Sequence, residues 1–227
     1  MQILPTLWQQ NCVLCTDDAK NAALCPTCQS DLPNMPDSLC PICALPVSEP
    51  GILCGSCLKH PPAYGRTLAA YAYSFPLDRL VHAFKYHHQF SLLDTLTAPL
   101  VEALQYHPRP DAILPMPLHP GRLRERGYNQ ALLLAQHLAR QLKLPLLTHS
   151  CQRTRATAEQ AHLTREQRLE NLRGAFACDA TVQGLHIAIV DDVMTSGSSV
   201  QHLAQSLKQA GASAVECWVV ARALHIH

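Results

Sequence analysis

Four Cys-x-x-Cys pairs within the first 57 residues constrain this 227-residue chain more than any other feature. The pairs are Cys12/Cys15, Cys25/Cys28, Cys40/Cys43 and Cys54/Cys57. A Cys-x-x-Cys turn presents two sulfurs from one tight knuckle, and Zn²⁺ takes four thiolates in a tetrahedron, so two knuckles complete one site. The four pairs therefore predict two zinc sites. Because four-thiolate sites are closed to other ligands, we expect both to be structural.

The spacing favours a sequential grouping, in which the first two pairs hold one ion and the last two hold the other. An interleaved grouping stays open at this point. A disulfide cluster or a set of redox-active pairs is a weaker alternative, because redox Cys-x-x-Cys motifs usually start a helix in a thioredoxin-like fold and no such fold is visible. His60 follows the last pair, but eight cysteines already fill two sites.

The cysteine-rich segment is a separate unit in composition. It is rich in proline and lacks a periodic apolar face, so it cannot bury enough surface to fold alone. Metal binding would supply the missing folding free energy. The composition changes near residues 60–62, and we expect a double zinc ribbon at 1–60 and a second domain at 61–227.

The chain lacks the sequence features of a membrane or secreted protein. No apolar run reaches the roughly 18 residues of a membrane span, and residues 1–10 have neither a basic start nor a sufficient apolar stretch for a signal peptide. We therefore expect a cytoplasmic protein. In that reducing compartment, paired cysteines are metal ligands more often than disulfides. The remaining cysteines, Cys151, Cys178 and Cys217, are isolated in the sequence.

After residue 62 the pattern becomes that of an α/β domain. Strands are expected at 67–73, 112–114, 185–190 and 215–221. Helical spacing of apolar residues predicts helices at 77–88, 92–106, 130–142 and 200–210. Alternating strands and helices indicate a mainly parallel sheet that is covered on both faces.

The segment after the third expected strand has the features of a phosphate site. The apolar run 185–190 leads into Asp191 and Asp192, then into the small, hydroxyl-rich run Thr195-Ser196-Gly197-Ser198-Ser199, and then into a helix. Gly197 allows the backbone to approach a ligand closely, and backbone N–H groups at a helix start attract phosphate. The two carboxylates could accept hydrogen bonds from sugar hydroxyls or help to hold Mg²⁺.

Two other interpretations of this segment have less support. One is a plain strand-to-helix connection with a serine N-cap, but adjacent carboxylates would repel each other without a ligand. The other is a phosphoacceptor receiver domain, in which an acidic pair lies near the N-terminus of the domain. Here the pair lies near the C-terminus.

Basic residues gather in the middle of the chain. Residues 121–173 contain ten Lys or Arg against four Glu, in a chain whose net charge is +1. Arginine forks suit a pyrophosphate and also the backbone of single-stranded DNA, with Tyr86 or Tyr128 available to stack on a base. The arginines that adjoin turn residues, and not a helical face, are the favoured binding candidates: Arg122, Arg124, Arg126, Arg153 and Arg155. By contrast, Arg168 and Arg173 are expected on a solvated helical face.

The run from Ile187 to Ser199 resembles the 5-phosphoribosyl-1-pyrophosphate (PRPP) signature of type I phosphoribosyltransferases. Together with the four cysteine pairs, it makes the chain similar to the ComF family of competence-associated proteins, which combine a double zinc ribbon with a phosphoribosyltransferase-like domain. Further family-like segments are Pro115 to Gln130, Arg153 to Asn171 and the pair Lys85-Tyr86. One departure is mild, since Thr195-Ser196 stands where two threonines are common.

The resemblance implies a type I phosphoribosyltransferase fold behind the zinc ribbon and assigns roles to several residues. Asp191 and Asp192 would meet the ribose hydroxyls, and Thr195 to Ser199 would hold the 5-phosphate. The stretch 117–126, with Arg122 and Arg126, would face the pyrophosphate. A flexible loop that closes over a type I site, and further candidates for DNA contact, would include these residues: Arg124, Tyr128, Arg153, Arg155, Thr157, Gln160, Lys85 and Tyr86.

By the same resemblance, the chain would bind incoming single-stranded DNA during natural transformation. A translocase helicase and recombination proteins would be its partners, and it would work in the cytosol, including the cytosolic face of the inner membrane. PRPP with Mg²⁺ would occupy the phosphate site. The main alternative is an active phosphoribosyltransferase, although no recognition element for an acceptor base is evident after the 215–221 strand. A zinc-ribbon adaptor that binds only protein would leave the phosphate loop unexplained.

Overall fold

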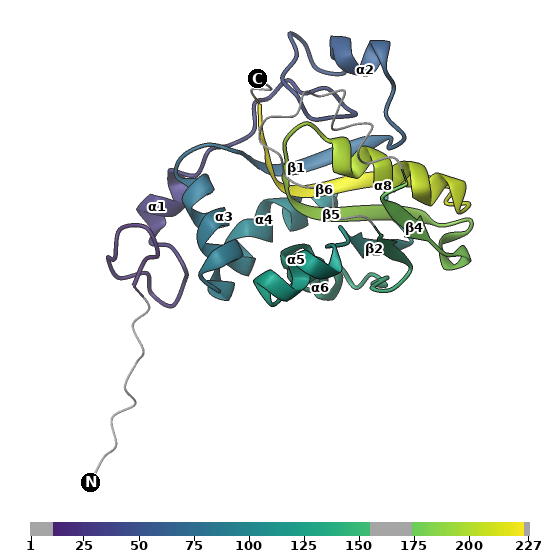
Figure 1. Cartoon of the computed structure of the whole chain (residues 1–227). Coiled ribbons are helices and arrows are strands. Elements are labelled where there is room, and N and C mark those ends of the chain that lie inside the picture. Colours follow the sequence, from purple (N-terminus) through teal and green to yellow (C-terminus); the bar gives the residue numbers. More distant parts are fainter. Residues whose placement is uncertain (1–10, 155–173, 225–227) are drawn as a thin grey trace.

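The computed structural model describes residues 11–154 and 174–224. A parallel four-stranded sheet forms its centre (Figure 1). The strands follow one another across the sheet in this order: β1 (Arg66–Ala72), β6 (Ala214–Arg222), β5 (His186–Met194) and β2 (Ala112–Pro115). Since β5 lies between β6 and β2, a ligand at its carboxyl end has neighbours on both sides.

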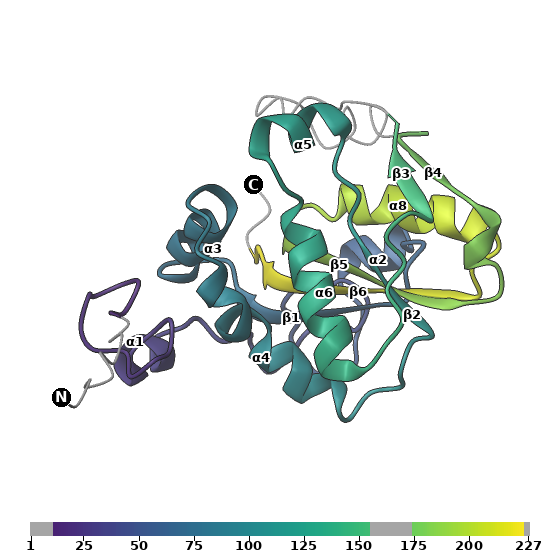
Figure 2. The ribbon, with the colours of Figure 1, turned by 90° about the horizontal axis from the view of Figure 1, so that it is seen from below.

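Helices cover both faces of this sheet, as the apolar runs predict. One face carries α3 (Leu77–Tyr86), η1 (Phe90–Leu92), α4 (Leu93–Leu104) and α6 (Gln130–Leu142). The other carries η2 (Ala180–Val182), α8 (Ser198–Gln209) and the antiparallel pair β3 (Cys151–Arg153) and β4 (Phe176–Cys178). Figure 2 shows α4 and α6 on the near side of the sheet and α8 on the far side.

Alternate residues of the central strands enter the two cores. In β5, Ala188 and Val190 pack with the α4 and α6 side, while Ile187 and Ile189 pack with α8. All four are almost completely buried. A strand that is apolar at every position is therefore the direct consequence of a sheet buried on both faces.

The predicted strands and helices are all present, but β5 is longer than expected. Its pairing with β6 continues from Asp191 opposite Val219 to Met194 opposite Arg222. The two aspartates therefore lie within the last part of the strand and not after it. The expectation that the strand ends at residue 190 was wrong, because β6 is long enough to pair with three further residues of β5: Asp191, Val193 and Met194.

Cys151 and Cys178 are isolated in the sequence, but the fold brings them together. They lie opposite each other in the β3–β4 pair and form a disulfide across a sequence separation of 27 residues. Sequence spacing gives no sign of this pairing, because the strand register brings the two residues together. Cys217, by contrast, is a free and buried thiol.

The two halves of the cysteine-rich segment lie apart. Figure 1 shows α1 (Pro26–Ser30), from the first half, beside α3, whereas α2 (Gly55–Lys59), from the second half, lies over the β1–β6 side of the domain. The first half shares a core with the α/β domain, since Leu24 and Leu32 belong to the same apolar cluster as Tyr71 and Leu77. In the second half, Ile42 packs against both its own cysteines and the domain core.

Arg222 fastens the second half to the end of β5. This side chain is 1% exposed. Its Nε donates to the carbonyl of Cys43 at 2.8 Å, and its Nη1 donates to the carbonyls of Met194 and Ala223 at 2.9 Å each and also to that of Thr195. A buried guanidinium is tolerated only when its donors are paired. One cation therefore ties together a cysteine knuckle, the end of β5 and the loop that follows.

We expect Arg222→Met to lower the free energy of unfolding of the zinc-loaded protein by roughly 3 kcal/mol. Each hydrogen bond from a charged donor contributes about 1.5–3 kcal/mol, and buried carbonyls are left unpaired by the change. Urea unfolding would measure this. Arg140→Met, on the exposed side of α6, serves as the control and should change stability by about 0.5 kcal/mol or less. Equal effects of the two variants would contradict the role of Arg222.

Candidate functional site

The loop after β5 is compact and rich in donors. Gly197 has φ 76° and stands at the N-cap of α8. A Cβ at this position would lie 3.2 Å from the Tyr64 hydroxyl, so both the backbone conformation and the space call for glycine. Ser196 Oγ lies 2.9 Å from Ser198 Oγ and accepts from the Ser198 backbone N–H at 3.3 Å. The predicted phosphate loop thus comes together at a helix start, where N–H groups lack helical acceptors.

The acidic pair has a counter-charge within the chain. Lys85, in the last turn of α3, places its Nζ 2.8 Å from Asp192 Oδ2. The Asp192 side chain is 7% exposed, and its Oδ1 accepts the backbone N–H of Val193 at 2.7 Å. Asp191 Oδ1 accepts the N–H of Asp192 at 2.9 Å. Lys85 therefore offsets part of the repulsion between the two carboxylates.

Burial and the neighbouring charge act on both partners. Burial, reinforced by the charge on Asp192, raises the pKa of Asp191 to about 7, although Lys85 opposes the shift. For Lys85, burial alone would lower the pKa, but the Asp192 carboxylate and then the Asp191 charge outweigh it, so the pKa of Lys85 is raised. At neutral pH, the protonated and ionised forms of Asp191 are therefore similar in free energy. A cation or a hydroxyl donor beside the carboxyl group would favour its ionised form.

We expect the unfolding free energy in Mg²⁺-free buffer to carry a pH dependence from Asp191. Its folded pKa is raised, so this contribution to stability is complete below about pH 4 and is lost as the pH rises through about 7. Asp191→Asn should therefore stabilise the protein at pH 8.5 by on the order of 2–4 kcal/mol and much less at pH 5. Denaturant unfolding at both pH values measures the difference. The exposed control Asp37→Asn should show no such gap; a pH-independent effect of Asp191→Asn would refute the shift.

The arginines of residues 122–126 lie on a helix, which corrects the expectation that they adjoin turns and not a helical face. The helix α5 (Pro120–Arg126) has proline at its first position and ends at Gly127 in the left-handed region. This arrangement of proline and glycine is a helix signal in the sequence. Arg122 pairs with Glu125 at 3.5 Å on an exposed surface, so this contact adds little stability.

Arg126 connects α5 to α3. Its guanidinium lies 5.1 Å from the centre of the Tyr86 ring, and its Nη2 donates to the Tyr86 hydroxyl at 3.4 Å. Its Nη1 donates to Gln130 Oε1 at 2.7 Å. Since Lys85 precedes Tyr86, the contact with Asp192 and the stack on Arg126 come from adjacent residues. The structure thus brings together Lys85, Tyr86 and Arg126, which the sequence placed on distant segments.

Tyr128 and Arg153 are held by other contacts. The Tyr128 hydroxyl donates to the carbonyl of Phe84, and its ring packs 5.1 Å from the ring of His88 and 5.3 Å from that of Phe90. Arg153 lies 5.7 Å from the Phe176 ring, and its charge acts to lower the pKa of Asp191. Three predicted loop residues lie outside the described residues: Arg155, Thr157 and Gln160.

The cysteines gather into two clusters in the sequential grouping: Cys12, Cys15, Cys25 and Cys28 in one, and Cys40, Cys43, Cys54 and Cys57 in the other. Within each cluster the sulfurs lie within 4.8 Å of one another. The sulfur atoms of Cys15 and Cys25 are 3.6 Å apart, and those of Cys43 and Cys54 are 3.5 Å apart. Four thiolates at about 2.3 Å from a zinc ion stand roughly 3.8 Å apart, so both clusters fit Zn²⁺.

The first cysteine of each cluster has a lowered thiol pKa, which favours metal binding. Burial opposes its ionisation, but backbone N–H groups directed at the sulfur outweigh burial. They lower the pKa of Cys12 to about 6 and that of Cys40 to about 7. Zn²⁺ binds the thiolate, so this arrangement favours the metal-bound form.

We expect Cys15→Ser and Cys57→Ser each to reduce the bound zinc from two equivalents to one, with different consequences. Loss of the second cluster removes the knuckle that Arg222 holds, so Cys57→Ser should also weaken phosphate-ligand binding at least ~10-fold. Cys15→Ser, in the first cluster, should change that affinity much less. Elemental analysis and titration with ribose 5-phosphate would test both variants, and an equal loss of affinity would count against the coupling.

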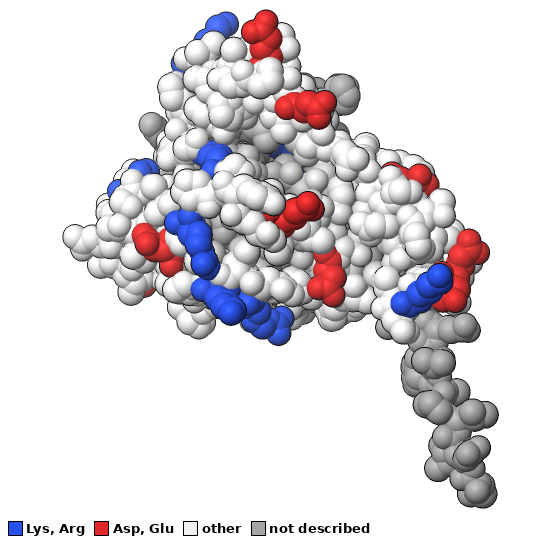
Figure 3. Space-filling view, turned by 180° about the vertical axis from the view of Figure 1, so that it is seen from behind, with Lys and Arg blue, Asp and Glu red and all other residues white. Residues whose placement is uncertain are grey.

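Two surface features bear on partners. Figure 3 shows a face that is mostly uncharged, with basic side chains along one edge and scattered acidic ones. Among the described residues, no helix combines the length and apolar character needed to cross a bilayer.

Among solved structures, the chain resembles a glutamine phosphoribosylpyrophosphate amidotransferase from B. subtilis with a TM-score of 0.42 and 15% sequence identity. The likeness covers 62% of this chain and 30% of the amidotransferase.

Comparisons of sequence identify relatives across most of the chain. Residues 3–58 match the double zinc ribbon domain family, and residues 129–225 match the phosphoribosyl transferase domain family. The DNA utilization protein YhgH of Salmonella typhi is 40% identical, covering 82% of this chain and 85% of that protein. Competence protein F of Haemophilus influenzae is 34% identical, covering 93% and 96%. Competence protein ComFC of Bacillus subtilis is 23% identical, covering 84% and 80%. The chain therefore belongs to the ComF family, in which a double zinc ribbon precedes a phosphoribosyltransferase-fold domain.

Proposed function

We propose that this protein handles single-stranded DNA during natural transformation and binds PRPP with Mg²⁺ at the carboxyl end of β5. The relatives are named for competence and for DNA utilization, which supports a competence role. The observation that carries the ligand proposal is the meeting of the hydroxyl-rich loop Thr195–Ser199 with the acidic pair Asp191-Asp192 at one strand end.

The residues present fit such a ligand. The N–H groups at the start of α8 and the serine hydroxyls would hold the 5-phosphate. Asp191 would accept from ribose hydroxyls, while Asp192 is paired with Lys85. A Mg²⁺ ion, when bound with PRPP, would neutralise phosphate charge, and the two carboxylates are oxygen donors of the kind it takes. On the β2 side, α5 carries Arg122 and Arg126, which would face the pyrophosphate.

The same region provides a platform for a nucleic-acid strand. Tyr86 is 53% exposed, and Arg126 lies against its ring. Exposed aromatic rings stack on bases without regard to sequence, and arginines pair with the backbone phosphates. The strand would therefore pass over α3 and α5, next to the phosphate loop, with Arg124 as a further phosphate contact. The proposed location is the cytoplasm, at the cytosolic face of the inner membrane, with a translocase helicase and recombination proteins as partners.

A second candidate function is an active phosphoribosyltransferase. The intact phosphate loop and the acidic pair favour it, because a PRPP site serves transfer of the ribose phosphate as well as binding. Pyrophosphate release with PRPP, Mg²⁺ and a panel of nucleobases would distinguish it from binding alone.

We expect Tyr86→Ala to weaken binding of single-stranded DNA by about 5- to 100-fold, since stacking of one base contributes about 1–3 kcal/mol. Fluorescence anisotropy at two salt concentrations, with and without PRPP and Mg²⁺, measures this. Tyr106→Ala is the matched control. Tyr106 is also exposed, at 84%, but it lies at the opposite end of the sheet from the phosphate loop. Its neighbour His107 contacts Arg66 at the amino end of β1. Competition by PRPP would place DNA at the phosphate site. Absence of salt-sensitive DNA binding by the unmodified protein would overturn the DNA-handling proposal.

A further inference from the structure

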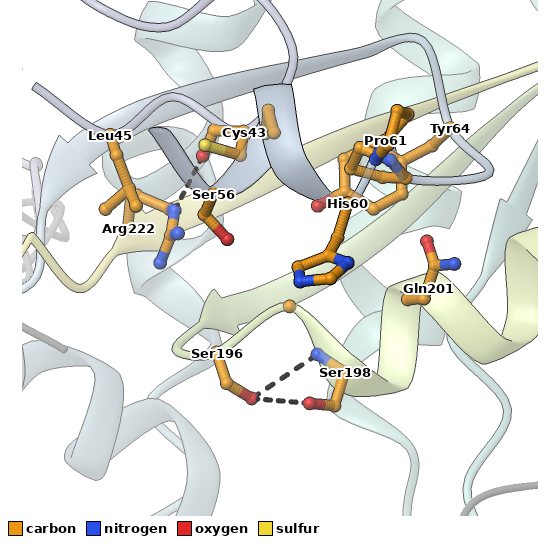
Figure 4. A pocket seen from close by; sticks show the side chains of 13 residues that line it. Cys43, Leu45, Ser56, His60, Pro61, Tyr64, Ser196, Ser198, Gln201 and Arg222 are labelled. Atoms are coloured by element: carbon orange, nitrogen blue, oxygen red, sulfur yellow. Dashed lines mark hydrogen bonds between the residues drawn. The ribbon is translucent and has the colours of Figure 1, made fainter. Parts of the chain in front are cut away.

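A pocket of about 460 Å³ lies between the second cysteine cluster and the phosphate loop (Figure 4). Its size is within the roughly 300–1,000 Å³ that small-molecule sites occupy. Cys43 and Cys57 line it on the ribbon side, and Ser196, Gly197 and Ser198 line it on the loop side. The pocket and the phosphate loop therefore share residues, so a ligand could occupy both at once.

The position of the pocket follows from the order of the strands. β5 lies between β6 and β2 in the sheet. The helix α5, which follows β2, would border one side of a ligand at the end of β5. The second cysteine cluster, held by Arg222 at the end of β6, would border the other side. A ligand whose phosphate lies on the loop would thus extend on this second side into the pocket, away from the arginines of α5.

The lining has the character of a site for a flat polar ring. Leu45, Pro61 and Pro62 give rigid apolar walls, while Ser56, His60 and Gln201 provide polar groups. Figure 4 shows the His60 ring extending from the ribbon side toward the loop, with Gln201 of α8 beside it. Few polar groups set among apolar walls are typical of sites that orient a heterocycle by its edge.

Gln201 is fixed in orientation by the chain itself. Its Oε1 accepts the backbone N–H of Ala63 at 2.8 Å, so its amide nitrogen is left as a donor of known position. Tyr64 is 5% exposed, and its hydroxyl lies 3.2 Å from the position that a Cβ of residue 197 would take. The side chains of Gln201 and Tyr64 thus hold the segment that joins the ribbon to β1 against the start of α8 and the phosphate loop. This wall of the pocket is therefore pre-formed.

We propose that this pocket takes the base of a nucleoside 5′-phosphate whose phosphate lies on the loop Thr195–Ser199. The ligand is either a free mononucleotide or the 5′-terminal nucleotide of a DNA strand. The inference rests on the proposed function of the phosphate loop. It gives the second cysteine cluster a role as one wall of a ligand site, and it gives Gln201 and His60 the role of contacting the base edge.

The test uses the full-length, zinc-loaded protein and compares ribose 5-phosphate with adenosine and thymidine 5′-monophosphates by calorimetry. We expect at least one mononucleotide to bind ~10-fold or more tightly than ribose 5-phosphate. Gln201→Glu keeps an acceptor for the Ala63 N–H but removes the amide donor, so it should abolish most of that gain. Gln205→Glu makes the same charge change one turn further along α8, at an exposed position outside the pocket, and should retain the gain. His60→Ala, at an exposed ribbon residue, is an independent second variant and should also reduce it.

The source of the nucleotide is decided by oligonucleotides. A 5′-phosphorylated oligothymidylate that binds ~10-fold more tightly than its 5′-hydroxyl counterpart, with the difference lost in Gln201→Glu, would identify a strand terminus as the ligand. A gain confined to mononucleotides would identify the free nucleotide. If ribose 5-phosphate binds but no base adds affinity, the pocket proposal is overturned while the phosphate site stands. If neither ribose 5-phosphate nor any nucleotide binds, the phosphate site itself fails, and this inference with it.

Discussion

The buried guanidinium of Arg222 holds the candidate site in its arrangement. It donates at once to Cys43 in the second cysteine cluster, to Met194 at the end of β5 and to Thr195 at the start of the phosphate loop. A cation that is 1% exposed cannot be left without acceptors, so these three backbone segments must stay together for the fold to be stable. The conformation of the loop that places Gly197 at the start of α8 is therefore coupled to the folding of the second cysteine cluster, which lies far from the loop in the sequence.

A second constraint acts from the other side of β5. Lys85 at the end of α3 neutralises Asp192, and the adjacent Tyr86 stacks with Arg126 of α5. Two helices are thereby positioned around a pair of carboxylates that would otherwise repel each other. The raised pKa of Asp191 shows that one counter-charge does not fully offset the cost of burial and of the neighbouring carboxylate. Ligand groups that favour the ionised form would relieve this cost, which is a physical reason for the site to respond to a cation or to sugar hydroxyls.

The cysteine clusters differ in what they hold in place. The first packs into the core formed by α3 and β1 and serves the stability of that side of the domain. The second cluster lines one side of a pocket, and the phosphate loop lines the opposite side. The two cysteine clusters, which follow each other in the sequence, thus lie at separate positions in the fold. The residues between them pass along β1, where the carbonyl of Pro33 accepts the backbone N–H of Ala72.

Features with local causes can be predicted from the amino-acid sequence of this chain. Cysteine spacing gave the two clusters, apolar periodicity gave the strands and helices, and the glycine and hydroxyl residues after an apolar run gave the phosphate loop. Pro120 and Gly127 are also local signals for α5, although the expectation for the arginines between them is that they adjoin turn residues. Contacts between residues distant along the chain arise from the three-dimensional fold: Lys85 with Asp192, Arg222 with Cys43, and Cys151 with Cys178. These contacts depend on strand order and register, which bring groups together across 27 to 179 residues and leave no mark in local composition.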